Sequence, residues 1–503
     1  MRRPARPRCP TPARRPPPRS SRPRRPLRPR PGHRSWPIRR IRCSTRTRPT
    51  RTTSRPTSLS TSRRCGRRSP RRGSSSRVRA VSATSCTAPS ATTFDLDQCN
   101  LQAIDATDGS IAWEDRIDGS CLLDEASMVT NPLVDGDGNV YTGDSRMLVS
   151  FTAEGELRWT NDVIAGLPSE KGLINPPFGI NRLPTGELVT VTLGDGWVLV
   201  FDPDTGELLH EPFDLPSAKS PPASGGPLAE QPDGFMLGLL GPRGADLIYD
   251  YSFGASEFEV DNNVSVVPGD SGMFVIAGGA MAPNEDNKAG LWVLELTDAG
   301  PEVVLRVEID AGDGGVGTTP VVSADGEFVL MGDNGTGIVA VDLASCLAET
   351  ERGGVCVDYT TAELGRQLGI SPGLYPDGGG DRDGRGQGRP RVQLGRDDDG
   401  NVELAPLWQA FDQGGTIAGS VSTLYDNAVA TMAFNASELT AELVLLDPHT
   451  GEVLSRMPSG DFANVSLAAD GETFIVNHLN AVTEILGGEA PAGVEGWRAV
   501  PTN

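Results

Sequence analysis

The chain has 503 residues, with 66 acidic and 46 basic side chains and a formal net charge of −20. Residues 1–80 contain 28 arginines and no Lys, Asp or Glu, so residues 81–503 hold 18 basic and 66 acidic side chains, a net charge of −48. A body this acidic repels nucleic acid and anionic lipid, which argues against both as its partners.

Residues 1–87 form an Arg-, Pro-, Ser- and Thr-rich segment without the apolar runs that build a core, and we expect it to be disordered. Three interpretations are open: a basic arm that binds nucleic acid or membrane, a targeting peptide, and a stretch that is not native protein. We favour the third, because this composition is typical of a GC-rich gene translated in the wrong frame. Residues 376–396 have a similar composition, and we expect an irregular or corrupted stretch there.

A short pattern begins after the basic segment and recurs along the rest of the chain. Its first copy is "AIDATDGSIAW", an apolar run, an Asp-Gly turn and a second run that ends on tryptophan. Looser copies lie near Asp250, Leu296, Asp342 and Asp398. The defining residues of the clear copies are Asp105, Gly109 and Trp113; Gly155 and Trp159; Asp202 and Gly206; and Asp447 and Gly451.

Each copy predicts a β-hairpin, because apolar runs flank a turn in which Gly adopts φ > 0 and Asp or Thr bonds the backbone. A second hairpin pattern lies between the copies, for example "NPLVDGDGNVYTGD" at 131–144. Two hairpins per repeat make four antiparallel strands, which is one propeller blade. The eight markers are 46 to 56 residues apart and favour an all-β, eight-bladed propeller over a seven-bladed one. We assign residues 88–490 to the propeller and 491–503 to a C-terminal tail.

The first copy resembles the repeat of the quinoprotein (PQQ-type) β-propellers, Ala-x-Asp-x-x-Thr-Gly-x-x-x-Trp. Asp105, Gly109 and Trp113 match this pattern, and the resemblance extends over roughly residues 95–490. It implies that Trp113 and Trp159 pack between neighbouring blades, as the family's tryptophans do.

The resemblance also raises the question of whether this chain binds a cofactor, because the family's dehydrogenases hold PQQ and Ca²⁺ over the propeller axis. This chain has no adjacent-cysteine pair, lacks the long insertions that build those sites, and has only 5% aromatic residues to sandwich a quinone. We therefore predict no cofactor, with Ca²⁺ or PQQ as the alternative. Asp261, Asn262 and Asn263 are metal-ligand candidates, because they cluster oxygen atoms before a strand where propeller lactonases and esterases place ligands near the axis.

Four cysteines form two pairs that disulfides could close, Cys99 with Cys121 and Cys346 with Cys356. No Cys-x-x-Cys motif occurs, so the sequence excludes zinc ribbons and thioredoxin-type redox sites. Two loop-closing pairs favour an oxidising compartment, and buried free thiols in a cytosolic protein are the alternative. No run of about 18 apolar residues predicts a transmembrane segment, and no signal peptide is visible.

These observations predict a secreted, periplasmic or envelope-exposed propeller, a monomer without catalysis of its own, that binds a protein, peptide or glycan on one face. The alternative is an enzyme with its site on the axis, either a quinoprotein-like oxidoreductase or a metal-dependent, lactonase-like hydrolase. A nucleic-acid binder would depend wholly on residues 1–80.

Overall fold

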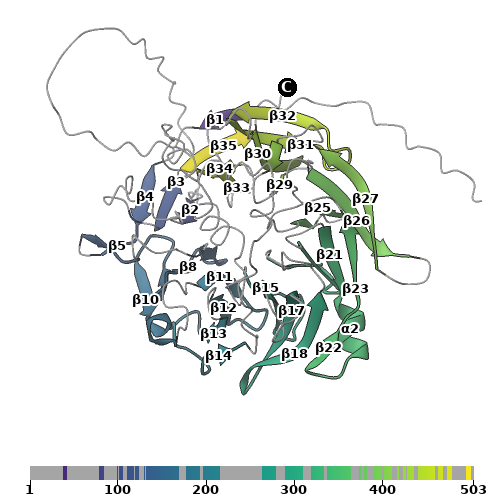
Figure 1. The fold of residues 1–503 in the computed structure, drawn as a ribbon. Coiled ribbons are helices and arrows are strands. Elements are labelled where there is room, and N and C mark those ends of the chain that lie inside the picture. The colour runs from purple at the N-terminus through teal and green to yellow at the C-terminus, as the bar shows by residue number, and fades with distance from the viewer. Residues whose placement is uncertain are drawn as a thin grey trace, which may run out of the picture.

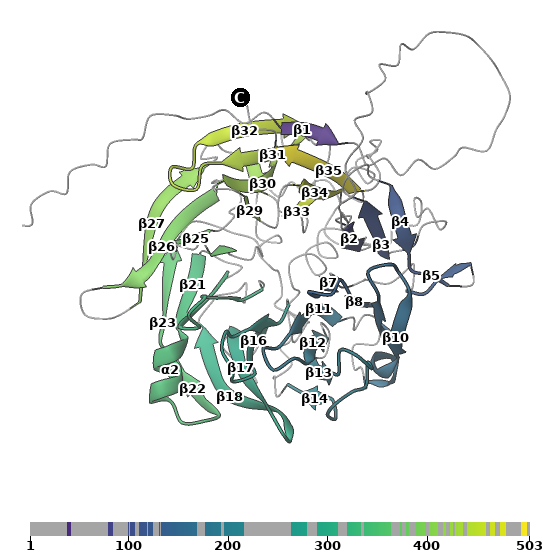
Figure 2. The same ribbon diagram turned by 180° about the vertical axis from the view of Figure 1, so that it is seen from behind.

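The fold is seen in a computed structural model, and it is a ring of antiparallel β-sheets arranged about a common axis (Figures 1 and 2). The residues that the structure describes are 38–41, 79–83, 99, 101–105, 110–117, 119–123, 130, 132–168, 177–192, 196–215, 263–278, 289–309, 319–332, 337–363, 373–374, 379–381, 389–397, 402–410, 416–418, 423–425, 428–435, 440–458, 463–467, 473–478 and 494–499.

The described strands form eight sheets, which we number 1 to 8 in chain order, and one separate hairpin. Sheet 1 contains β2 (Arg79–Ala83), β3 (Leu101–Asp105) and β4 (Ile111–Glu114), and the hairpin of β5 (Arg116–Ile117) and β6 (Ser120–Cys121) follows it. Sheet 2 contains β7 (Leu133–Val134), β8 (Val140–Gly143), β9 (Leu148–Phe151) and β10 (Leu157–Asn161), followed by the 3₁₀ turn η1 (Val163–Gly166). Sheet 3 contains β11 (Pro177–Arg182), β12 (Leu188–Thr192), β13 (Trp197–Phe201) and β14 (Phe213–Asp214).

Sheets 4 and 5 come from the middle of the chain, and a short helix lies between two of their strands in the sequence. Sheet 4 contains β15 (Ser265–Val266), β16 (Met273–Gly278), β17 (Ala289–Thr297), β18 (Gly300–Ile309) and the parallel edge strand β22 (Gly354–Cys356). Sheet 5 contains β19 (Val321–Val322), β20 (Phe328–Gly332), β21 (Gly337–Asp342) and β23 (Tyr359–Glu363), with α2 (Leu343–Glu349) after β21. No helix in the described part of the chain is long and apolar enough to cross a bilayer.

The last three sheets complete the ring. Sheet 6 contains β24 (Gly373–Leu374), β25 (Gly379–Asp381), β26 (Arg389–Arg396) and β27 (Val402–Ala410). Sheet 7 contains β28 (Thr416–Ala418), β29 (Thr423–Tyr425), β30 (Ala428–Asn435), β31 (Thr440–Leu446) and β32 (Val453–Pro458). Sheet 8 contains β33 (Ala463–Leu467), β34 (Thr473–His478), β35 (Val494–Ala499) and, from the other end of the chain, β1 (Ile38–Ile41).

Two compositional predictions fall on segments of which the structure describes a part. Residues 1–87 were expected to be disordered; within them Ile38–Ile41 and Arg79–Ala83 are strands that pair with β35 and β3, and the prediction for the rest of this segment is untested. Residues 376–396 were expected to be irregular or corrupted, and they contain β25 and all of β26. An arginine-rich composition does not exclude a strand, because backbone groups make the hydrogen bonds between strands.

Neighbouring sheets pack face to face, and each strand therefore serves two cores. In β12, Val189 and Val191 pack toward sheet 4, whereas Leu188 packs toward sheet 2. In β16, Val275 packs toward sheet 5, whereas Phe274 packs toward sheet 3. Side chains alternate across a strand, so a strand buried on both faces is largely apolar, and the polar residues of β12 are the buried threonines Thr190 and Thr192.

The repeat motif shapes the contact between one sheet and the next. The Trp113 Nε1 donates to the Ala153 carbonyl at 3.0 Å, and the Trp159 Nε1 donates to the Pro203 carbonyl at 3.0 Å. Each indole lies against the turn glycine of the following sheet, Gly155 or Gly206, where a Cβ would clash with the ring. These glycines also have φ of 88° and 72°, which L side chains rarely adopt.

The strand order separates the connections into two sets at opposite ends of the sheets. In a four-stranded meander, the turns between strands 1 and 2 and between strands 3 and 4 leave from one end, which we call the turn face. The connections between strands 2 and 3, and those that lead to the next sheet, leave from the other end, which we call the loop face. Sheet 3 is an example, with residues 183–187 on the turn face, whereas β12 ends and β13 begins at the loop face.

Replacing Trp159 by alanine tests the contact between sheets 2 and 3. Trp159 is 8% exposed, and we expect Trp159→Ala to lower the free energy of unfolding by about 3–5 kcal/mol in urea denaturation. Trp197→Ala is the matched control, because its indole is only partly buried. Equal losses in the two variants would contradict the packing role of Trp159.

Shortening the chain tests whether β1 closes the ring. A chain that begins at residue 46 lacks β1, and we expect it to lose on the order of 2 kcal/mol or more, because four paired residues of β35 lose their partners. A chain that begins at residue 31 keeps β1 and should melt with the full-length protein. If both shortened chains melt alike, β1 does not contribute to closure.

Candidate functional site

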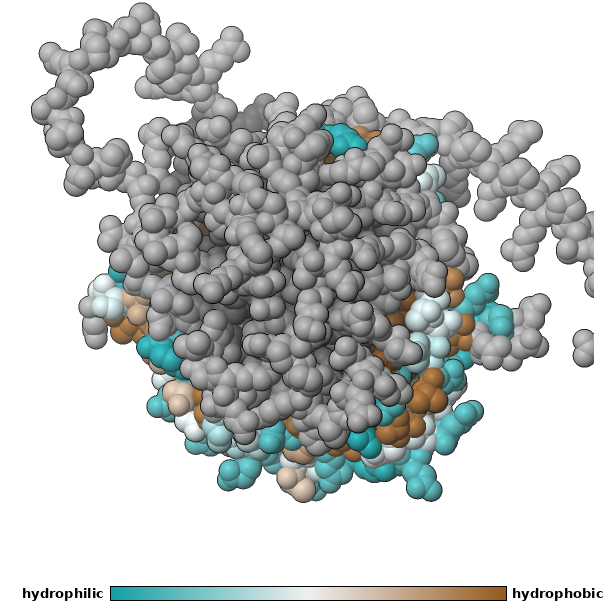
Figure 3. All heavy atoms as spheres, viewed as in Figure 1, coloured by the Kyte–Doolittle hydropathy of each residue, from teal (hydrophilic) through white to brown (hydrophobic). Residues whose placement is uncertain are grey.

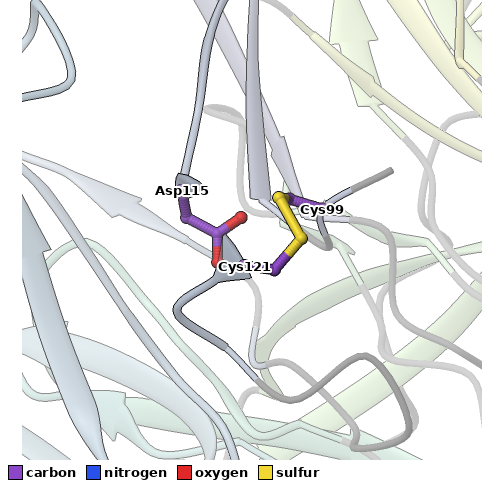
Figure 4. Close-up of side chains that lie close together, drawn as sticks. All are labelled: Cys99, Asp115 and Cys121. Atoms are coloured by element: carbon purple, nitrogen blue, oxygen red, sulfur yellow. A yellow bond between two sulfur atoms is a disulfide. The ribbon is translucent and has the colours of Figure 1, made fainter. Parts of the chain in front are cut away.

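The most distinctive cluster of chemically active side chains follows sheet 1. Cys99, Asp115 and Cys121 place their sulfur and carboxylate oxygen atoms within 4.8 Å of one another. Figure 4 shows the Asp115 carboxylate facing the two sulfur atoms. Cys99 precedes β3, Asp115 directly follows β4, and Cys121 ends the β5–β6 hairpin, so the cluster joins two connections on the loop face.

The two cysteines are bonded to each other. The Cys99–Cys121 disulfide spans 22 residues, with a Cα–Cα distance of 5.3 Å. Zinc is held by thiolates, and both sulfur atoms are already in the S–S bond, so the oxidised cluster is not a thiolate zinc site. The second pair is bonded too, and the Cys346–Cys356 disulfide links α2 to β22.

Asp115 is a buried carboxylate held by backbone amides. Its Oδ1 accepts from Leu101 N at 3.3 Å, and its Oδ2 accepts from Leu123 N at 3.0 Å. Among the residues that the structure describes, no Lys, Arg or His forms an ion pair with it. Burial raises the pKa of Asp115 above its ordinary value of 3.8, and the backbone hydrogen bonds from Leu123 and Leu101 oppose this only in part.

The same carboxylate fixes the path of the chain into sheet 2. Leu123 is 1% exposed and packs with Leu101, Val149 and Phe151 in the core between sheets 1 and 2. Arg146 donates to the Leu122 carbonyl at 3.2 Å and is paired with the buried Asp144 at 3.0 Å. The disulfide, the carboxylate and the apolar anchor together hold this connection in place.

A second polar cluster joins sheets 2 and 3 on the turn face. Arg158 donates to the Tyr141 hydroxyl at 3.1 Å, and that hydroxyl donates to Asp135 at 2.9 Å. Burial and the hydrogen bond to Asp135 raise the pKa of Tyr141 above its ordinary value, against the effect of Arg158. Burial also acts to raise the pKa of Asp135, but hydrogen bonds from Asn139 and Tyr141 outweigh it and the net shift is downward. Arg158 also forms an ion pair at 3.1 Å with Asp204, in the turn that follows β13, so the cluster joins sheet 2 to sheet 3.

The repeat residues lie in turns and caps. The Asp202 carboxylate accepts from Asp204 N at 2.9 Å and Thr205 N at 2.8 Å, and Asp447 accepts from His449 N and Thr450 N at 2.8 and 2.9 Å. The glycines after them, Gly206 and Gly451, both have φ of 72°. Asp105 ends β3, and Gly109 lies outside the described residues.

Asp342 departs from the predicted hairpin. It is the N-cap of α2, where its Oδ1 accepts from Ser345 N at 3.0 Å, and it also bonds Arg396 of the next sheet. A helix therefore follows this copy of the repeat, because Asp342 and Ser345 have the spacing of an N-cap.

The predicted metal candidates are only partly described. Asp261 and Asn262 lie outside the described residues. Asn263 precedes β15 and packs against Gly179 of β11, where a Cβ would clash with it. It therefore sits between sheets 3 and 4, and the metal prediction is untested.

The ring of face-to-face antiparallel sheets makes this protein a β-propeller. Residues 71–229 match a family model described as "Outer membrane protein assembly factor BamB". This match confirms the predicted resemblance to the PQQ-like repeat family over this part of the chain.

Solved structures with low sequence identity resemble the chain. BamB from Moraxella catarrhalis is 12% identical, with a TM-score of 0.42, over 78% of this chain and 86% of that one. The Cps50 (Swd1) propeller domain of Myceliophteria thermophila is 10% identical, with a TM-score of 0.44, over 74% and 100%. A catalytically inactive virginiamycin B lyase from Staphylococcus aureus is 10% identical, with a TM-score of 0.39, over 74% and 96%. No curated protein sequence matches the chain.

Replacing Asp115 by asparagine tests the buried carboxylate. The folded pKa lies above the unfolded value, so the folded chain takes up this proton at a higher pH than the unfolded chain does. The contribution of Asp115 to stability therefore grows as pH falls through the window between its raised pKa and 3.8, and is lost as pH rises through it. We expect the stability of the wild type, relative to Asp115→Asn, to be greater at about pH 4.5 than at about pH 7 in urea denaturation.

Glu114→Gln is the control, because Glu114 is the neighbouring acid and is only partly buried. A difference between wild type and Asp115→Asn that stays constant over this pH range would contradict the assignment.

Proposed function

We propose that this protein is a non-catalytic, eight-bladed PQQ-like propeller that binds a protein, peptide or glycan through its loop face. In this proposal each of the eight sheets is one blade, and sheet 8 is closed by strands from both ends of the chain. The protein acts as a scaffold in a secreted or envelope compartment. Asp115 and the two disulfides support the rigid frame.

The observation that carries this proposal is the unequal spacing of consecutive strands on the two faces. The turn face has tight turns such as residues 135–139 and 298–299, although residues 343–358 are an exception that holds α2 and β22. On the loop face, consecutive strands of one sheet lie further apart in the chain, from Gly278 to Ala289 in sheet 4 and from His478 to Val494 in sheet 8. Binding residues concentrate in the segments that join the strands of a rigid frame, so the loop face has more chain to offer a partner.

The rim offers less support for a binding role than the loop face does. Figure 3 shows hydrophobic and hydrophilic residues mixed along the part of the rim that is coloured. Singly exposed apolar side chains such as Leu157 and Val357 are ordinary on a soluble surface. The rim therefore gives no reason to prefer it over the loop face.

Two further observations support the compartment and the class of function. Both disulfides close short segments, which suits an oxidising compartment. The family that residues 71–229 match is described by an assembly factor of the outer membrane, which is a role in binding other proteins. We extend that role to this chain as a proposal.

Photocrosslinking in the native cells tests the binding face. A photoreactive residue at Asp162 or Ala165 is exposed on the loop face, whereas one at Glu154 or Thr185 is exposed on the turn face. We expect the loop-face positions to give one discrete adduct, identifiable by mass spectrometry, and the turn-face positions to give none. Adducts confined to the turn face, or none at any position, would count against the proposal.

Calorimetry with Ca²⁺ and with PQQ separates the scaffold from the alternative enzyme. We expect no binding heat from either, because the scaffold needs neither for its frame. Micromolar binding of PQQ would favour a quinoprotein-like oxidoreductase, and micromolar binding of Ca²⁺ alone would favour a metal-dependent hydrolase.

A further inference from the structure

We propose that the Cys99–Cys121 disulfide is a thiol–disulfide exchange site, in which a dithiol attacks Cys121 and Asp115 exchanges a proton with Cys99. This role concerns the frame of the propeller and does not depend on what the loop face binds.

Exposure selects the sulfur that is attacked. Cys99 is 2% exposed, whereas Cys121 is partly exposed at the end of β6. Thiol–disulfide exchange needs an attacking thiolate to reach one of the two sulfur atoms. Cys121 is therefore the sulfur that an external thiol can attack, and Cys99 is the leaving group that is released toward the interior.

Asp115 supplies what a buried leaving group needs. A thiolate released at Cys99 would lie beside a carboxylate in a desolvated site, and two unpaired anions there are unfavourable. A proton carried by Asp115 and passed to Cys99 leaves one neutral thiol and one carboxylate that two backbone amides stabilise. Burial raises the pKa of this carboxyl, so it holds a proton at a higher pH than an exposed aspartate does.

The exchange balances in two steps. The first thiolate of the dithiol bonds to Cys121 Sγ as the S–S bond breaks, and Cys99 leaves and takes the Asp115 proton. The second thiolate of the dithiol then attacks the first sulfur of the same dithiol, which is bonded to Cys121 Sγ, and Cys121 is released. The dithiol is oxidised by two electrons and the protein disulfide is reduced. Oxidation runs in reverse, with Asp115 accepting the Cys99 proton.

The other charged groups around this site are paired with one another. Glu114 is paired with Arg116 at 3.4 Å, and Asp144 with Arg146 at 3.0 Å. Arg146 reaches this region from sheet 2, where it donates to the Leu122 carbonyl. Glu114 adds a small repulsion that also raises the pKa of Asp115.

The chain contains its own reference disulfide. Near Cys346 and Cys356 the polar contacts come from the backbone of Asp358, whose N–H donates to Cys356 Sγ at 3.4 Å and whose carbonyl oxygen lies 3.8 Å from Cys346 Sγ. No third ligand-type side chain clusters with this pair in the described part of the chain. The ratio of the two reduction rates in one molecule cancels the titration of the reductant itself.

The experiment measures that ratio by alkylation and mass spectrometry, with dithiothreitol as a small dithiol and a reduced Cys-x-x-Cys protein as a protein dithiol. We expect the ratio of Cys99–Cys121 to Cys346–Cys356 reduction to rise severalfold as pH falls from about 8 to about 5, with at least one reductant. The reductant that gives the larger ratio identifies the source of the dithiol.

Asp115→Asn should abolish the pH dependence of the ratio, and Glu114→Gln should keep it. A ratio that does not change with pH in the wild type overturns the proposal, and this result needs no variant to fold. A ratio with the same slope in wild type and Asp115→Asn also overturns it.

Discussion

The structure depends on the burial of each sheet on both of its faces. Valine, leucine and isoleucine along β12 and β16 are divided between two cores, so a strand cannot shift by one residue without exchanging its partners on both sides. The tight packing of sheet on sheet excludes water from the interfaces, and a ring is the arrangement in which no sheet is left with a bare face. The last sheet of the ring takes its edge strand, β1, from the other end of the chain, where it pairs with β35.

Hydrogen bonds and close contacts from tryptophan also join neighbouring sheets, in addition to the apolar cores. A tryptophan from one sheet lies on the turn glycine of the next and donates to a turn carbonyl, at Trp113 with Gly155 and again at Trp159 with Gly206. The glycine is needed twice, for its positive φ and for the missing Cβ. This explains why Asp, Gly and Trp recur together. The Asp forms the turn, the Gly leaves space for the indole, and the Trp comes from the preceding sheet.

The sequence predicted this periodic part because every element of it is local. Asp202 with Gly206, and Asp447 with Gly451, form the expected turns within five residues of chain. At Phe151 the aspartate is lost, and the Thr152 hydroxyl accepts from Glu154 N and Glu156 N instead. Non-local features could not be predicted in this way. The strand that closes sheet 8 comes from an arginine-rich segment more than four hundred residues away, and the marker at Asp250 lies outside the described residues.

In the candidate site, too, one feature could be predicted from the sequence and another could not. The pairing of Cys99 with Cys121 was suggested by their spacing around the first repeat, but nothing in the spacing of Asp115 indicates burial against the disulfide. Asp115 follows "IAWE" and reads as one more acidic residue in a chain of 66. The available signal was its position directly after a strand and between two cysteines that form a pair.

Three other described aspartates differ from Asp115 in what they stabilise. Asp202, Asp325 and Asp342 accept hydrogen bonds that lower their pKa, so they remain ionised and hold a turn or a cap. At Asp115 the cost of burial outweighs the same kind of hydrogen bonds. A carboxyl that only had to hold the chain would be better placed at the surface, as Asp202 is. Its burial beside the Cys99–Cys121 disulfide therefore has a cost that the turn aspartates avoid, and proton exchange with Cys99 is a role that requires this position.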